Sequence, residues 1–278
     1  MIIGASSFAS PLPELQREVD SIELYMPKLG LYKGTSLVRE RLEELSDTLS
    51  TGNFPTSMHA PYFGDSPNYP PELMIDTAHM SRTQMRLMEE CIELAGRFGS
   101  KVIVVHPGKI TGTGAGDQAE VRECCFNSMV GNLKKLACTA AEHDVMLGLE
   151  NKEGTDPTNL CCSSLELKRA IEAVDSPSLG ATFDIGHANL TCGGDMRLMR
   201  NFARELCDSV VHLHVHDNKG TPEGRYFGDL HGAPGEGCID FNVLSELRYS
   251  GIYNLEVFTL EGIRKGKRVL GSLDNNHS

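Results

Sequence analysis

The chain has 278 residues and is 40% hydrophobic, which suffices for a sizeable core and is a normal size for a closed α/β barrel. No apolar run reaches the ~18 residues that a membrane helix needs, and no basic segment precedes the first apolar run, so we expect neither a membrane span nor a signal peptide. The formal net charge of -12 argues against non-specific attraction to nucleic acid phosphates, although a local patch or bound cations can reverse the sign at a site.

Short apolar, β-branched runs alternate with segments of helical periodicity along the whole chain. The eight predicted strands cover residues 1–6, 21–26, 56–62, 101–108, 145–151, 179–187, 210–217 and 253–258, and helices are expected at 74–98, 120–142, 165–174 and 197–207. This alternation predicts a single (β/α)8 TIM barrel over residues 1–278. The glycine-rich segment 111–116 is predicted to be a loop after the fourth strand, not a domain boundary.

The nine cysteines include two adjacent pairs and form no CxxC motif. Adjacent cysteines rarely bridge one another, and a disulfide framework is typical of small secreted domains. We therefore expect reduced thiols in a cytoplasmic protein.

Acidic residues and histidines stand where the predicted strands end, which is where barrels of this class carry their sites. They are His59, His106, Glu150, Asp184, His187, His214, Asp229, His231 and Glu256, and they come from six consecutive strands and the loop after the seventh. One such residue alone is more often structural. A ring of imidazoles and carboxylates, however, resists desolvation unless cations are bound. The mixed nitrogen and oxygen ligands suit zinc, with manganese, iron or magnesium as alternatives.

The seventh strand reads VVHLHVHD and carries His212, His214 and His216 at alternate positions, so all three face the same side. Successive histidines lie ~6.6 Å apart along the strand. We interpret His212 as a core residue satisfied by a neighbour, His214 as the metal ligand, and His216 as a group that supports the ligands or faces the substrate. Asn151 and Asn189, which are close in sequence to predicted ligands, are expected to orient ligands or substrate.

These motifs resemble the xylose isomerase-like barrels, which include the endonuclease IV family and many sugar isomerases and epimerases. The resemblance runs from His59 to Glu256 and is carried by HAPY, HPG, LEN, DIGHA, LHVHD and DLHGAPGEG. It implies that the nine residues bind up to three zinc ions, with Glu150 bridging two of them. It also implies that Tyr62 enters a damaged duplex, with packing over the site as the alternative reading.

Two features depart from the endonuclease pattern. The loop after the second strand, MPKLGLYKG, contains Lys28 and Lys33 but lacks the arginine that enters the minor groove in that family. In LHVHD, His216 replaces an amide. The departures leave metal binding intact and weaken the case for DNA recognition.

Two enzymatic functions therefore remain open. The first is a metal-dependent phosphodiester hydrolase that acts on abasic-site DNA or a related phosphate ester. The second is a sugar or sugar-phosphate isomerase or epimerase. In the second, Glu150, Asp184, His214 and Glu256 bind one metal, and Glu150 and Glu256 act as the acid/base pair.

In the isomerase reading, His187 contacts a substrate hydroxyl, and the remaining histidines become substrate contacts. A metal-binding protein without catalysis is a third and weaker alternative, because open ligand sets are usually catalytic. The basic run RKGKR at 264–268 is predicted to be a solvated helix face, with phosphate binding as the alternative. The sequence does not define the oligomeric state.

Overall fold

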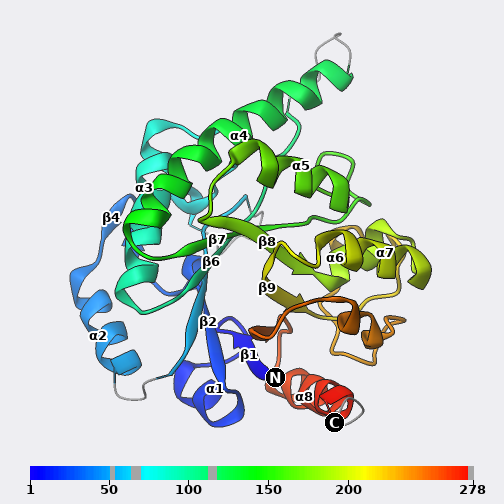
Figure 1. Cartoon of the computed structure of the whole chain (residues 1–278). Coiled ribbons are helices and arrows are strands. Elements are labelled where there is room, and N and C mark those ends of the chain that lie inside the picture. Colours follow the sequence, from blue (N-terminus) through cyan, green and yellow to red (C-terminus); the bar gives the residue numbers. More distant parts are fainter. Residues whose placement is uncertain (51–53, 64–69, 112–117, 275–278) are drawn as a thin grey trace.

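Eight parallel strands close into a barrel in the computed structural model, which describes residues 1–50, 54–63, 70–111 and 118–274. Around the barrel, the strand order is β1-β10-β9-β8-β7-β6-β5-β2 (Figure 1). The strands are β1 (Ile2–Ser6), β2 (Ser21–Tyr25), β5 (Thr56–His59), β6 (Val102–Val105), β7 (Met146–Glu150), β8 (Leu179–Asp184), β9 (Val210–Val215) and β10 (Ile252–Leu255). Each lies in or overlaps one of the eight predicted runs, which confirms the predicted barrel.

The helices lie on the outside of the barrel (Figure 1). They are α1 (Leu12–Glu18), α2 (Arg39–Ser50), α3 (Arg82–Arg97), α4 (Gln118–Glu142), α5 (Ser164–Val174), α6 (Ile185–Thr191), α7 (Met196–Leu206) and α8 (Leu260–Asp274). Short 3-10 helices occupy Met26–Lys28, Pro71–Leu73, Arg225–Gly228 and Phe241–Glu246, and a small hairpin pairs β3 (Tyr32–Lys33) with β4 (Ser36–Leu37). None of the helices described is long and apolar enough to cross a bilayer. All nine cysteines are free thiols.

Helix α3 begins at Arg82, so the predicted start at residue 74 is wrong. Ser81 caps the helix: its hydroxyl accepts from the backbone N–H of Gln84, and the Gln84 side chain accepts from the backbone N–H of Ser81. This reciprocal pair fixes the helix start. The apolar residues before it lie in a loop and a short 3-10 turn. The predicted end is confirmed, since the chain leaves the helix through Gly99 at a φ of +73°. The glycine-rich segment after β6 lies almost wholly in 112–117, outside the described residues.

The interior of the barrel contains a polar network. Glu23 on β2 is fully buried, and its Oε1 accepts from the Ser6 hydroxyl at 2.6 Å and from the Asn254 amide at 3.0 Å. Its Oε2 lies 3.0 Å from Nε2 of both His212 and His214 on β9. Interiors of such barrels are usually filled by branched apolar side chains. Here Ser6, Glu23, His212, His214 and Asn254, all fully buried, occupy part of the interior instead.

Candidate metal centre

Strand register and a helix cap place two predicted ligands side by side. Asp184, the last residue of β8, pairs in register with His214 on β9. Asp184 is also the N-cap of α6, and its Oδ1 accepts from the backbone N–H of His187 at 2.7 Å. An aspartate that caps a helix holds the residue three positions later beside it. The DxxH spacing thus results from local helix geometry.

Glu150 at the end of β7 lies at the centre of the site and is 1% exposed. Its Oε2 lies 3.1 Å from His106 Nε2, 3.8 Å from His59 Nε2 and 3.5 Å from His214 Nδ1. Its Oε1 lies 3.0 Å from His187 Nδ1. This carboxylate therefore contacts ligands from four other segments, and it belongs to more than one of the three groups described below.

The first group consists of His59, His106 and Glu150, whose ligand atoms all lie within 4.8 Å of one another. His59 Nδ1 lies 2.9 Å from the backbone carbonyl of Ala60 and donates to it, which leaves Nε2 with a lone pair directed at Glu150. Burial lowers the pKa of His106 to about 3. The His106 ring therefore offers the neutral nitrogen that a metal requires, and the Nε2 of His59 faces the same carboxylate oxygen of Glu150.

The second group surrounds Nδ1 of His214 and consists of His214, Glu150, Asp184 and Glu256. From this nitrogen, the nearest carboxylate oxygens of Glu256, Glu150 and Asp184 lie at 3.4, 3.5 and 3.7 Å. His214 Nε2 donates to Glu23, which fixes the ring and leaves Nδ1 free to bind a cation. Three carboxylates and one imidazole therefore converge on one small volume.

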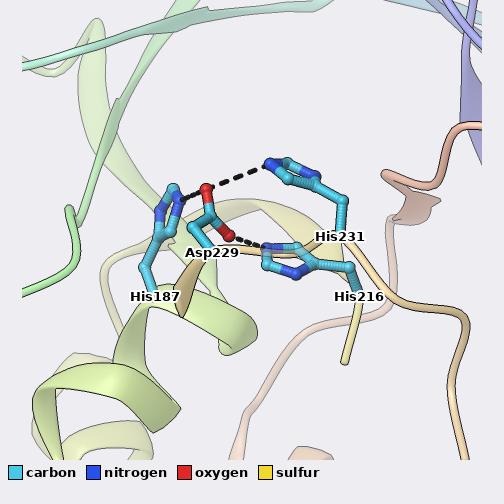
Figure 2. A group of neighbouring side chains, drawn as sticks. All are labelled: His187, His216, Asp229 and His231. Atoms are coloured by element: carbon cyan, nitrogen blue, oxygen red, sulfur yellow. Dashed lines mark hydrogen bonds and ion pairs between the residues drawn. The ribbon is translucent and has the colours of Figure 1, made fainter. Parts of the chain in front are cut away.

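The third group consists of His187, His216, Asp229 and His231, again within 4.8 Å of one another (Figure 2). His187 Nδ1 lies 2.9 Å from the carbonyl of Asn151, and His231 Nδ1 lies 2.8 Å from the carbonyl of Glu256. Each ring thus directs Nε2 at Asp229 Oδ2, at 3.1 Å in both cases. Burial opposes protonation of His231, but Asp229 and Glu256 outweigh it and raise its pKa to about 9. The space beside Asp229 thus favours a positive charge.

Several ligand atoms in these groups are buried without a hydrogen-bond partner among the residues described. They are Glu150 Oε2, His214 Nδ1 and Asp229 Oδ1. Unsatisfied buried polar atoms are costly, and they are accounted for when an ion binds them. Two of these atoms, Glu150 Oε2 and His214 Nδ1, face one another in the second group. The residues present therefore fit divalent metal ions, and they do not specify which metal is bound.

His216, which was not predicted to be a metal ligand, lies within contact distance of two predicted ligands. Its Nε2 is 3.1 Å from Asp184 Oδ1 and 3.7 Å from Asp229 Oδ1, and its ring stacks on His231 with centroids 4.3 Å apart. Gly186 makes room for it, because a Cβ there would lie 2.0 Å from the His216 ring. His216 bridges the second and third groups, and its assignment as a supporting or substrate-facing residue stays a prediction.

The predicted asparagines organise the backbone beneath the site. The Asn151 side chain donates to the carbonyl of Asp184 and accepts from its N–H, both at 2.9 Å, which ties the end of β7 to that of β8. Asn189 donates to Asn218 at 2.8 Å in the loop after β9. Both are buried and hold ligand-bearing segments in place. Their predicted substrate contacts stay predictions.

Three residues that contact the predicted ligands or anchor their loops escaped the sequence analysis. Asp217, in LHVHD, accepts from the backbone N–H groups of Asn218, Gly235, Gly237 and Ile239, and so anchors the loop that carries Asp229 and His231. Glu23 orients His214 from below. Lys152 lies buried beside His187. Glu23 could have been recognised as a charged residue inside an apolar strand. Lys152 could have been recognised in LENKE, where it stands close to two glutamates.

Aromatic side chains flank the site. The Tyr62 ring centroid lies 4.2 Å from that of His106, and the Tyr62 hydroxyl is 2.7 Å from that of Tyr25. Phe258 is 54% exposed. Its ring centroid lies 5.2 Å from that of His231 and 5.3 Å from that of Phe8. The Tyr62 contacts support packing over the site, and its predicted insertion into DNA stays untested.

The basic run on α8 is engaged within the chain. Arg264 pairs with Glu18, and Lys265 pairs with Glu236 at 3.1 Å. These contacts support the solvated helix face over the phosphate-binding alternative.

Residues 16–273 match the model of the xylose isomerase-like TIM barrel family. The chain belongs to this family. An uncharacterized protein of Methanocaldococcus jannaschii is 30% identical over 210 residues, which are 70% of this chain and 65% of that protein. A probable endonuclease 4 of Mesomycoplasma hyopneumoniae is 25% identical over 167 residues, 58% of this chain and 56% of that protein. The alignments thus span less than two thirds of either relative.

Among solved structures, a D-tagatose 3-epimerase-like protein superposes with a TM-score of 0.79 at 25% identity. The superposition covers 99% of this chain and 98% of that chain. The chain is thus similar both to a probable endonuclease and to an epimerase-like protein. Similarity alone does not choose between the two activities.

Proposed function

We propose that the chain is a divalent-metal-dependent phosphodiester hydrolase of the endonuclease IV type. The observation that carries this proposal is the presence of three ligand groups around Glu150, where a sugar isomerase needs only the second. Bound together, metal ions at such a site would activate water and neutralise charge on the phosphate and the departing oxygen. Zinc suits the histidine-rich first and third groups best.

The protein's contribution is to hold these ligands rigidly. Glu150 joins the first and second groups, Asp184 and His187 are fixed by the cap of α6, and Asp217 anchors the loop bearing Asp229. Rings whose second nitrogen donates to a carbonyl or carboxylate keep one orientation. The aromatic rings of Tyr62 and Phe258, beside His106 and His231, would supply flat apolar surfaces next to a bound phosphodiester, which suits an abasic duplex or another phosphodiester with a planar group.

A sugar isomerase or epimerase is the second candidate, and two observations favour it. The second group alone gives the three carboxylates and one histidine that such chemistry uses, and the 3-epimerase-like structure superposes over almost the full chain. In this function, Glu150 and Glu256 remove and return the proton at the epimerised carbon. The residues 26–34 after β2 also lack the arginine expected of a minor-groove contact.

A nicking assay on a duplex with one abasic site tests the first candidate, using zinc-reconstituted full-length chain. Strand cleavage that Glu150→Gln abolishes would support hydrolysis. Asp144→Asn is the matched control, because Asp144 is an exposed carboxylate whose one ion pair among the residues described is with Lys101. No cleavage of abasic DNA or of a simple aryl phosphodiester would contradict this candidate.

Proton exchange tests the second candidate. A ketohexose incubated with the manganese- or zinc-loaded chain in deuterated water should gain deuterium next to its carbonyl group, as read by NMR, because an acid/base pair exchanges its proton with solvent. Glu256→Gln should abolish this exchange. Absence of exchange across ketohexoses and their phosphates would count against the epimerase.

A further inference from the structure

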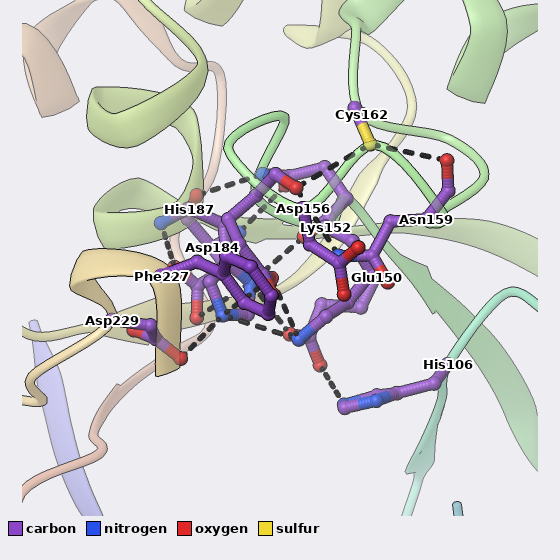
Figure 3. Close-up of polar contacts among 12 residues, drawn as sticks. His106, Glu150, Lys152, Asp156, Asn159, Cys162, Asp184, His187, Phe227 and Asp229 are labelled. Atoms are coloured by element: carbon purple, nitrogen blue, oxygen red, sulfur yellow. Dashed lines mark hydrogen bonds and ion pairs between the residues drawn. The ribbon is translucent and has the colours of Figure 1, made fainter. Parts of the chain in front are cut away.

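A buried lysine lies among the ligand atoms of the third group, and the proposed chemistry does not use it. Lys152 follows Glu150 by two residues and is 7% exposed. Its Nζ lies 3.2 Å from His187 Nε2, 3.3 Å from Glu153 Oε2 and 3.8 Å from Glu150 Oε1. Figure 3 shows this side chain beside Glu150 and His187. A fixed positive charge therefore lies between the third group and the shared glutamate.

The contact with His187 uses the nitrogen that a metal ion would need. Because the carbonyl of Asn151 accepts the Nδ1 proton, a neutral His187 ring holds its lone pair on Nε2, and the Lys152 ammonium lies 3.2 Å from that nitrogen. That lone pair cannot bind an ammonium proton and a metal ion at once. Occupation of His187 by a metal therefore requires Lys152 to move away.

The ionisable groups around Lys152 are mainly carboxylates, so the lysine acts as their counter-ion. Glu153 Oε2 and Glu150 Oε1 lie 3.3 and 3.8 Å from its Nζ, so two buried carboxylates face the ammonium. A metal ion and an ammonium in so small a space repel one another strongly, because the interior screens charge weakly. The lysine thus neutralises carboxylates that a third cation would otherwise neutralise.

We propose that Lys152 is a built-in cation of the third group, which competes with a divalent metal ion for His187. The third group then binds its ion more weakly than the first and second groups bind theirs. The proposal deepens the proposed function, because it makes occupancy of the third metal position depend on the lysine side chain. It rests on the metal-dependent site and holds for either substrate class.

Metal titration of the full-length chain, stripped of metal and without substrate, tests this directly. Zinc is added against a chromophoric chelator, and bound zinc is counted by mass spectrometry, for wild type, Lys152→Met and Lys152→Gln. Lys152→Met should bind its weakest ion at least about 10-fold more tightly than wild type, while the tighter ions change little. Adding Asp229→Asn to Lys152→Met should remove the gain, because it weakens the third group itself.

Lys109→Met is the matched control. Lys109 also follows the end of a strand, and it pairs with Asp156 at 3.1 Å and lies 4.6 Å from the centre of the Phe63 ring. Its removal deletes one nearby positive charge without freeing a ligand, so we expect less than about a 3-fold change. Equal tightening by Lys109→Met, or unchanged or weaker binding in both Lys152 variants, would overturn the proposal.

Thermal unfolding gives a readout that does not depend on counting ions. Lys152→Met leaves Glu153 and His187 without the ammonium, so the metal-free variant should unfold at a lower temperature than wild type. Saturating zinc should then raise its unfolding temperature by more than it raises that of wild type.

If Lys152→Met does not fold without metal, Lys152→Gln, which keeps a donor for His187, supplies the comparison. An equal or smaller zinc-induced rise in the foldable variant would contradict competition. Because no substrate is present, inactivity on DNA or sugars would not affect the result.

Discussion

Two neighbouring clusters of histidines and carboxylates differ in whether their polar atoms are satisfied. In the deep cluster, Glu23 accepts from His212, His214, Ser6 and Asn254, so both carboxylate oxygens are saturated by donors. In the third group, two imidazole nitrogens and a buried carboxylate of Asp229 face one another. The residue types are the same in both clusters.

The difference teaches that donor direction, not composition, separates a structural network from a metal site. Glu23, His212 and His214 also have ligand atoms within 4.8 Å of one another, yet their hydrogen bonds already balance the buried charge. Around Asp229, His187 and His231 each direct Nδ1 at a backbone carbonyl and Nε2 at the carboxylate. Such a cluster is complete only with a cation.

The largest effect should come from Glu150→Gln, because this side chain belongs to both the first and second groups. We expect activity on the true substrate to fall by more than about 100-fold while the far-ultraviolet circular dichroism spectrum is unchanged. Activity of the metal-loaded variant close to that of wild type would show that the groups do not act as one site.

Removal of metal should have the next largest effect, and it should affect the metal-binding groups rather than the cluster around Glu23. A chelator should abolish activity and lower the unfolding temperature, since ligand present at 100 times its Kd stabilises a fold by about 2.7 kcal/mol. Readdition of zinc or manganese should restore both. An unfolding temperature that is the same with chelator and with metal would mean that the unsatisfied atoms are tolerated without a cation.

Glu23→Gln should mainly lower the stability of the fold, whether or not metal is bound. An amide cannot accept on both of its heavy atoms, so a buried donor of His212, His214, Ser6 or Asn254 loses its partner, at a cost of about 1–3 kcal/mol. Chemical denaturation should show this loss with and without metal. Asp229→Asn is the matched variant, and its effect on stability should appear mainly in the presence of metal.

His216→Asn should give the smallest effect. It restores the amide of the endonuclease pattern and removes one imidazole from the third group, so metal affinity at that group should fall by about 10-fold. His212→Asn is the comparison, and we expect it to lower stability more than metal affinity, because His212 Nε2 donates to the structural carboxylate of Glu23. Isothermal titration with zinc measures both.

The sequence alone determined the barrel and the residues at its rim. Strand periodicity and the rule that sites lie at the C-terminal strand ends are local and topological, and they brought His59, His106, Glu150, Asp184, His187, His214, Asp229, His231 and Glu256 to one edge. The spacing along β9 also separated His212 from His214, because depth in a strand follows residue number.

The tertiary structure alone decided how these residues divide into groups and which partners orient them. Glu23 and His212 are 189 residues apart in the chain, and the contact of Lys152 with His187 depends on the turn after β7. No local pattern encodes which nitrogen of a ring meets a carbonyl and which meets a carboxylate. That choice depends on side-chain directions from several strands at once, and it separates the saturated network around Glu23 from the groups that need cations.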